Sequence, residues 1–144
     1  MKLKLDNSTF KEIKAHAEAA YPEECCGFFF GNDSENREII LTREVHNSKE
    51  GDKSRRFEIA PGDYREAEKF ALEQELDLLG VYHSHPDHPA KPSQHDLEVA
   101  LPYFSYIIVS VREGKHDTTR SWQLNDDRQF VEEELEVTEY SITD

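Results

Sequence analysis

The feature that most constrains the fold is an apolar run that ends in two histidines and is followed at once by prolines. The run, Leu76 to His85, reads LDLLGVYHSH, and the overlapping segment 85–92, HPDHPAKP, contains three prolines. Because proline lacks a backbone N–H and has a fixed φ, this segment supports neither a regular helix nor an internal strand. The sequence therefore predicts a buried strand that ends here, followed by an irregular connection.

The two histidines, His83 and His85, are two residues apart, so their side chains would point to the same face of the strand. A helix is predicted directly after the prolines, with Ser93 at its N-cap and Asp96 in its first turn. That turn would bring the Asp96 carboxylate toward the histidine pair. Two imidazoles and one carboxylate leave a tetrahedral zinc ion with one position for water, which is the pattern of a catalytic site.

Each part of this pattern also has an ordinary structural explanation. Exposed histidines on strands are common, and Ser93 and Asp96 on their own form a capping pair. The neighbouring His88 and His95 lie off the spacing and are expected to be solvated. Only the combination of His-x-His, seven residues and Ser-x-x-Asp is specific enough to indicate a metal site.

A second informative segment, 21–31, reads YPEECCGFFFG and is predicted to join a helix end to a buried strand. Glu23 and Glu24 lie at this junction. A half-shielded carboxyl group there would have a raised pKa, which suits a general base, although solvated loop residues would have the same local sequence. Cys25 and Cys26 are adjacent, which disfavours a disulfide between them, and are predicted to be small buried apolar residues.

Together these residues resemble the motif of the JAMM (MPN-plus) metalloprotease family, which is a glutamate before x-Cys-Gly, then His-x-His, seven residues and Ser-x-x-Asp. The matching positions are Glu24, Cys26, Gly27, His83, His85, Ser93 and Asp96. The resemblance continues through the segment 44–61 between the two motifs and covers most of residues 8–125. The short chain is most similar to the small stand-alone prokaryotic members of the family.

The resemblance implies a role for each of the chemically active residues. His83, His85 and Asp96 would hold one Zn²⁺ per chain, with a water as fourth ligand. Glu24 would carry the proton of that water to the leaving nitrogen, and Ser93 would donate a hydrogen bond to the oxyanion. The family cleaves peptide or isopeptide bonds after the Gly-Gly tail of ubiquitin-like proteins. Its small prokaryotic members are associated with sulfur-carrier proteins, so a protein of either kind is the expected partner.

Two other functions remain open at this point. In a metal-free MPN-type scaffold the histidines or the aspartate are lost, whereas this chain keeps all of them. A zinc deaminase of similar fold would need a P-C-x-x-C signature, and Cys25 and Cys26 do not form one. Arg55 and Arg56 lie in the polar loop 51–57, where they would either meet a substrate carboxylate or be solvated.

The charge of the chain excludes one class of partner. Its 144 residues include 17 Lys and Arg and 31 Asp and Glu, so the net charge is −14 with neutral histidines. Nucleic-acid binding requires basic patches, which this balance disfavours. The first twelve residues, MKLKLDNSTFKE, lack the apolar segment of a signal peptide, and the apolar runs are too short to span a bilayer. We expect a cytoplasmic protein with no membrane partner.

The hydrophobic periodicity predicts helices and strands in a mixed order. Helices are expected at 8–21 and 61–75 in addition to the one after Ser93. The expected strands are 25–31, 37–46, 56–60, 104–111 and 118–124. Thr9 and Glu12 are spaced as a capping box for the first helix, and Trp122 is expected in the core. Residues 130–140 are predicted to form an edge strand or a tail.

These elements predict one α/β domain over residues 1–144, with a core at about 8–125 and a terminal strand or tail at 126–144. Its sheet would be mixed and flanked by helices. The resemblance implies the same architecture, since the JAMM/MPN fold is similar to that of cytidine deaminases.

Overall fold

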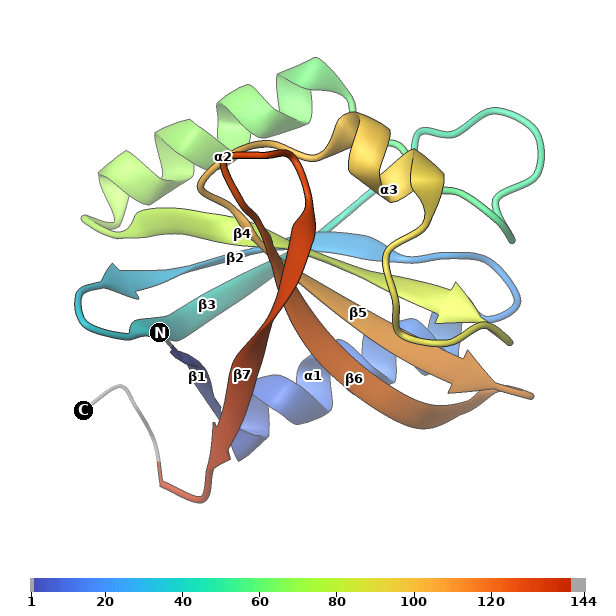
Figure 1. Cartoon of the computed structure of the whole chain (residues 1–144), viewed down its shortest axis with the longest axis horizontal. Coiled ribbons are helices and arrows are strands. Elements are labelled where there is room, and N and C mark those ends of the chain that lie inside the picture. Colours follow the sequence, from blue (N-terminus) through green and yellow to red (C-terminus); the bar gives the residue numbers. More distant parts are fainter. Residues whose placement is uncertain (1, 141–144) are drawn as a thin grey trace.

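The computed structural model describes residues 2–140, which form seven strands and three helices (Figure 1). In chain order they are β1 (Lys2–Asp6), α1 (Asn7–Ala20), β2 (Cys26–Asp33), β3 (Arg37–Val45), α2 (Pro61–Glu73), β4 (Asp77–Pro86), α3 (Gln94–Val99), β5 (Ser105–Arg112), β6 (Lys115–Leu124) and β7 (Phe130–Thr138). The fold is a single α/β domain with a mixed sheet and helices, as predicted.

The sheet is a closed barrel in the order β1-β3-β2-β4-β5-β6-β7. β4 and β5 pair in parallel, whereas β2 pairs antiparallel with both β3 and β4. The barrel closes because β1 pairs in parallel with β7, where Leu3 faces Leu135 and Leu5 faces Val137. The predicted strand at 130–140 is present as β7, but its expected place at an edge was wrong, since β7 lies between β6 and β1.

Closure depends on a strand that the sequence analysis missed. β1 has only five residues, and its two leucines are fully buried while Lys2 and Lys4 alternate with them on the solvent side. Outside the barrel Lys2 forms ion pairs with Glu134 and Glu136 of β7. The acidic residues that alternate along β7 therefore belong to the solvent face of a strand that is paired on both sides.

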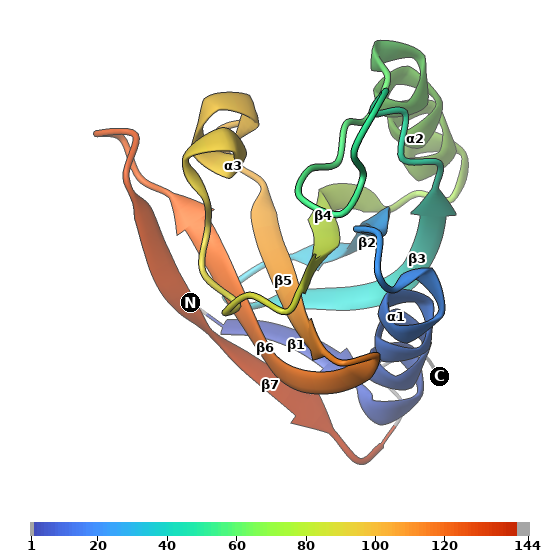
Figure 2. The same ribbon diagram turned by 90° about the vertical axis from the view of Figure 1, so that its right-hand side faces the viewer.

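Alternating residues of β2 divide the core into two clusters, one on each face of the sheet. Phe29 packs with α1 residues such as Ile13 and Ala17. Phe28 and Phe30 pack on the opposite face, in the cluster that includes α2. Figure 2 shows α2 and α3 above the strands and α1 below them, so α1 and α2 cover opposite faces of β2 and β3.

Close strand approach explains one glycine before the histidine motif. A Cβ atom on Gly80 of β4 would lie 1.8 Å from the backbone oxygen of Ser105 in β5. No side chain fits at that distance, so glycine is required for β4 and β5 to pair where β4 leads into the site.

Three further details differ from the sequence-based expectations. Asp6, and not Thr9, caps α1, since its carboxylate accepts a hydrogen bond from the Thr9 N–H. Residues 56–60 form no strand, because the Glu58 backbone bonds to Asn47 and Ser48 within the same loop. Trp122 is only half-buried, so its expected place in the core was wrong.

The cysteines and the helices agree with the remaining expectations. Cys25 and Cys26 are buried and free, and burial raises the pKa of the two thiols to about 11 and about 12. Within residues 2–140, every helix is too short or too polar to span a membrane.

Candidate metal centre

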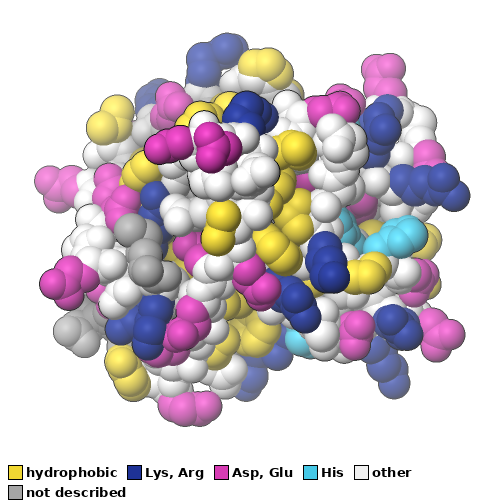
Figure 3. Space-filling view, in the orientation of Figure 1, with side chains coloured by type: hydrophobic (Ala, Val, Ile, Leu, Met, Phe, Trp, Pro, Cys, Tyr) yellow, Lys and Arg dark blue, Asp and Glu magenta, His cyan; other side chains and the backbone are white. Residues whose placement is uncertain are grey.

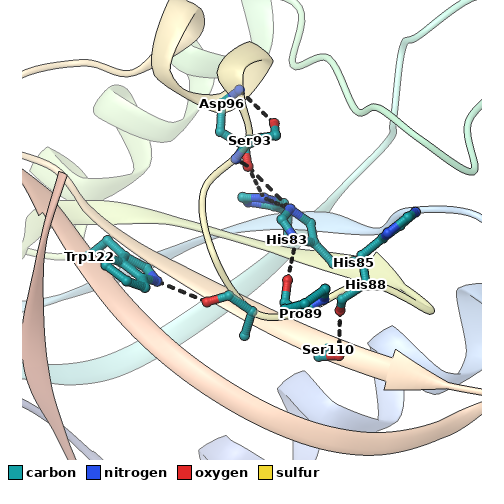
Figure 4. A network of polar contacts seen from close by, with 9 residues as sticks. His83, His85, His88, Pro89, Ser93, Asp96, Ser110 and Trp122 are labelled. Carbon is teal, nitrogen blue, oxygen red and sulfur yellow. Dashed lines mark hydrogen bonds and ion pairs between the residues drawn. The ribbon is translucent and has the colours of Figure 1, made fainter. Parts of the chain in front are cut away.

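The centre is built on the C-terminal end of β4, which carries His83 and His85 (Figure 4). Both imidazoles are buried, with 1 % and 7 % of their residue surface exposed. Their Nε2 atoms lie 3.1 Å apart, so the two side chains share one face of the strand as predicted. Between them Ser84 points away, and its Oγ accepts a hydrogen bond from the Cys25 N–H.

The carboxylate comes from the short helix α3, as the sequence predicts. Ser93 is its N-cap, and a capping box joins Ser93 and Asp96. The Ser93 N–H donates to Asp96 Oδ2 at 2.8 Å, and the Asp96 N–H donates to Ser93 Oγ at 3.0 Å. This reciprocal pair sets the orientation of the Asp96 side chain toward the histidines.

The three candidate ligand atoms form a nearly equilateral triangle. Asp96 Oδ2 lies 3.3 Å from Nε2 of His83 and 3.2 Å from Nε2 of His85. Zinc–nitrogen and zinc–oxygen bonds of about 2.0–2.1 Å at tetrahedral angles place their ligand atoms about 3.3 Å apart. The spacing of the three atoms is therefore that of three corners of a zinc tetrahedron.

Contacts behind the imidazoles favour the ligand role of Nε2. His85 Nδ1 lies 2.9 Å from the carbonyl oxygen of Pro89, which can only accept a hydrogen bond, so Nδ1 carries a proton. Nε2 of a neutral His85 then has its lone pair free for a metal. His83 stacks on Phe57 with 4.4 Å between ring centroids, and its Nδ1 has no hydrogen-bond partner within the described residues.

The charges of the three groups depend on one another. Burial alone would raise the pKa of Asp96, but the two histidines and the Ser93 N–H hold it well below its usual range. Burial lowers the pKa of His83 despite the nearby carboxylate. At His85, burial also lowers the pKa, but the hydrogen bond with Asp96 and the negative charge of Asp96 outweigh burial, so the pKa is raised. The pocket therefore stabilises an ionised aspartate beside a neutral His83.

Glu24 reaches the centre from the segment between α1 and β2. One carboxylate oxygen of Glu24 and one ring nitrogen of each of His83 and His85 lie within 4.8 Å of one another. Burial raises the pKa of Glu24 to about 8, while the His85 charge acts in the opposite direction. Glu23, its neighbour, is exposed. Of the two glutamates at this junction, only Glu24 is buried at the site.

The backbone around Glu24 is held by residues for which no role was predicted. The Glu24 N–H donates to the Lys53 carbonyl at 2.7 Å, and Asn47 Nδ2 donates to the Glu24 carbonyl at 3.0 Å. Asn47 also bonds the backbone of Arg56, so one amide ties the loop to the glutamate segment. The sequence signal for this asparagine was its place in the segment 44–61, where the family resemblance continues.

The segment 87–93 connects the two histidines to α3 and is anchored on the strands beneath it (Figure 4). Ser110 of β5 donates to the His88 carbonyl at 2.6 Å, and Trp122 Nε1 of β6 donates to the Ala90 carbonyl at 3.1 Å. Trp122 thus supports the loop that carries Ser93 instead of filling the core.

A cleft of about 450 Å³ opens beside the centre. It is lined by Glu24, Arg55, His85, His88, Pro89, Lys91 and Ser93. Arg55 and His88 line this cleft, whereas Arg56 and His95 do not. His88 is exposed, as expected, but His95 is half-buried.

The fold and this cluster define a class of protein, a small α/β domain with a candidate metal centre of two histidines and an aspartate beside a buried glutamate. Comparison with known proteins identifies the family. The chain belongs to the prokaryotic homologs of the JAB domain, whose model matches residues 6–125. The resemblance inferred from the motif is thereby confirmed.

Among curated proteins, the chain is 26% identical to a desampylase from Pyrococcus furiosus over 79% of this chain and 76% of that protein. It is 28% identical to the CysO-cysteine peptidase of Mycobacterium tuberculosis, over 87% of this chain and 84% of the relative. It is also 31% identical to tail tip assembly protein K of Escherichia phage N15, over 74% of this chain but only 40% of the phage protein.

Solved structures agree with the fold. The protein DSY2949 from Desulfitobacterium hafniense matches with a TM-score of 0.84 and 29% identity, over 97% of this chain and 95% of that chain. A Salinibacter ruber protein matches with a TM-score of 0.72 and 40% identity, over 93% and 90%. The JAB1/MPN domain protein AF2198 from Archaeoglobus fulgidus shares the fold at a TM-score of 0.60 and 19% identity, over 96% and 99%.

Proposed function

We propose that this chain is a zinc-dependent peptidase that hydrolyses the bond after the Gly-Gly tail of a ubiquitin-like protein of the sulfur-carrier kind. The observation that carries the proposal is the triangle of His83, His85 and Asp96, with sides of 3.1–3.3 Å, beside the buried carboxyl of Glu24. Two of the relatives named above are a desampylase and a peptidase, which supports the same class of reaction.

His83, His85 and Asp96 would hold the zinc ion, because their nitrogen and carboxylate donors are ones that zinc prefers. When bound, the ion supplies Lewis acidity that makes water a nucleophile near neutral pH. Three protein ligands are typical of catalytic zinc sites, whereas closed structural sites use four. Because these three residues are buried, side chains of other proteins could not easily reach the ion and replace them as ligands.

Glu24 would act as the proton carrier. Its carboxylate accepts a proton from the attacking water and delivers it to the nitrogen of the bond that breaks. A group with a pKa of about 8 can both accept and release a proton near neutrality. The backbone bonds to Lys53 and Asn47 fix the segment that presents this carboxyl group.

Ser93 would stabilise the carbonyl oxygen as it becomes negative. Its Oγ accepts a hydrogen bond from the Asp96 N–H, which leaves the hydroxyl proton available to a substrate. Ser93 is exposed and lines the cleft, so a carbonyl group can reach it. Comparable oxyanion donors contribute about 3–4 kcal/mol to the transition state.

An apolar cleft offers a place for the tail that precedes the bond. It encloses about 450 Å³ and is lined by Phe57, Glu58, Ile59, Pro61, Tyr64, Val99 and Leu101. Phe57 also stacks on His83, so this cleft adjoins the centre. An extended tail with few side chains would bind there through its backbone and through apolar contact.

The test is cleavage of ubiquitin-like proteins that carry extra residues after Gly-Gly, followed by mass spectrometry with the zinc-loaded protein. We expect Glu24→Gln to keep its zinc and to lose cleavage by a factor of about 100 or more, because it removes the proton carrier and no ligand. Glu23→Gln, which alters the exposed neighbour, should cleave like the unmodified protein. A Glu24→Gln variant that cleaves normally would refute the proposed mechanism.

Removal of the metal provides an independent check. A chelator should abolish cleavage, and added zinc should restore it. If no ubiquitin-like protein with an extended tail were cleaved by the zinc-loaded protein, the proposed function would be wrong.

A further inference from the structure

Two clefts meet at the metal centre, and only one of them has cationic residues in its lining. The apolar cleft adjoins His83 through Phe57. The second cleft, which includes Glu24 and His85, is bordered by the cationic side chains of Arg55 and Lys91. Figure 3 shows histidine side chains beside lysine and arginine side chains on the side of the molecule to which β4 points. A substrate that crosses the centre therefore meets Lys and Arg side chains on one side only.

Like most Lys and Arg side chains within residues 2–140, Arg55 and Lys91 are free of ion pairs, although acidic residues are abundant in this chain. Acidic residues outnumber Lys and Arg by 31 to 17, and other cations such as Lys2, Arg37 and Arg120 form ion pairs. Within residues 2–140, neither Arg55 nor Lys91 forms an ion pair or a side-chain hydrogen bond.

Asp52 is the acidic residue whose pKa responds to Arg55. That pKa is lowered mainly by hydrogen bonds from Ser54 and only to a smaller degree by the charge of Arg55. The Asp52 carboxylate is thus already bonded within its own loop. Arg55 is exposed, as is Lys91, and both remain available to an anion that enters the cleft.

The position of Glu24 indicates which part of the substrate enters this cationic cleft. Glu24 must reach the nitrogen of the bond that breaks in order to protonate it. Because Glu24 lines the cationic cleft, the group that leaves with that nitrogen lies there, and the acyl part lies toward Phe57.

We propose that Arg55 and Lys91 bind the free α-carboxylate of the leaving group, so that the chain releases one C-terminal amino acid from a Gly-Gly tail. This inference rests on the proposed function. Water adds across the amide bond: its oxygen and one hydrogen join the carbonyl carbon, and its second hydrogen travels through Glu24 to the nitrogen. The products are a Gly-Gly carboxylate and a free amino acid.

A conjugate on a lysine side chain would place a different group in the cleft. There the leaving nitrogen is attached to a carbon chain that ends in a protein backbone, without a free carboxylate near the bond. Arg55 and Lys91 would then have no anion to bind. Arginine forms paired, charge-assisted hydrogen bonds with a carboxylate, which gives the cleft a means of selecting a chain terminus.

The test uses a ubiquitin-like protein that is cleaved in the experiment above, extended after Gly-Gly by a single alanine. One form ends in the free carboxylate and the other in the carboxamide. The zinc-loaded protein should cleave the free acid with a kcat/KM about tenfold higher than that for the amide. Arg55→Gln and Lys91→Gln should each reduce this ratio toward unity, mainly by raising KM for the acid.

Arg56→Gln is the matched control, because Arg56 is also exposed but does not line the cleft. It should keep the full preference for the acid. Equal rates on both forms, or a preference that survives Arg55→Gln and Lys91→Gln together, would overturn this inference while leaving the proposed function intact. Failure to cleave any extended form would overturn the proposed function itself.

Discussion

The two halves of the metal centre are held in place by different means. His83 and His85 lie on a strand that is bonded on both sides, since β4 pairs with β2 and with β5. Ser93 and Asp96 lie on a six-residue helix reached through the segment 87–93. The strand half is therefore fixed by the sheet, whereas the helix half depends on a capping box and a few polar contacts.

This difference means that stability and metal affinity should respond differently to mutation. Changes in the sheet that carries the histidines should unfold the whole domain, because β4 pairs with β2 on one side and β5 on the other. Changes in the anchors of the helix half should move Asp96 relative to the histidines and leave the barrel folded. Local openings of weakly anchored segments are usual in proteins, and they commonly involve functional loops.

The largest expected effect is on the strand half. Gly80→Ala places a Cβ atom 1.8 Å from the Ser105 backbone oxygen, so β4 and β5 must separate. We expect the free energy of unfolding to fall by about 3–5 kcal/mol in chemical denaturation. Gly62→Ala in α2 is the control, since the nearest neighbour of its Cβ would be 3.7 Å away. It should be neutral or slightly stabilising, and an equally stable Gly80→Ala would contradict the account of the sheet.

A smaller effect on folding is expected in the helix half. Ser93→Ala removes the N-cap hydroxyl of α3 and should cost about 1 kcal/mol in the free energy of unfolding. Its cleavage rate should fall by about 10²–10³, because the same hydroxyl is the proposed oxyanion donor. Rates measured at equal zinc loading would separate the two roles. Unchanged cleavage would remove Ser93 from the mechanism and leave it as a cap only.

The smallest effect is expected at the anchor of the loop. Trp122→Phe keeps an aromatic ring but loses the hydrogen bond from Nε1 to the Ala90 carbonyl. Zinc affinity, measured by competition with a chelator, should fall by a factor of about 10 or less, with little change in melting temperature. A loss of melting temperature comparable to that of Gly80→Ala would show that the two halves are not separable.

The local parts of the site could be predicted from the sequence, and the distant ones could not. His83 with His85 and Ser93 with Asp96 are each joined by the period of one strand or one helical turn, which the spacing reveals. The backbone of Glu24 is held by Asn47 and Lys53, which lie in another segment of the chain. No local pattern reports such a contact.

The same reason explains the errors in the fold. β1 is short and contains only two buried apolar residues, so its periodicity is weak. The chain alone could not show that β1 would pair with β7, about 130 residues later, and convert an expected edge into a closed barrel. Trp122 was assigned to the core from its size, but its indole N–H bonds to a carbonyl of the site loop. Helices and strands with long apolar periods were predicted well.

The most direct test of the centre is the zinc content of the purified, untagged protein by elemental analysis. Asp96→Ala and Ser93→Ala each destroy one half of the same capping box, but only the first removes a proposed ligand. We predict about one zinc ion per chain in the unmodified protein and in Ser93→Ala, and little zinc in Asp96→Ala. A folded protein that refuses added zinc, or an Asp96→Ala variant that remains fully loaded, would contradict the assignment of the metal centre.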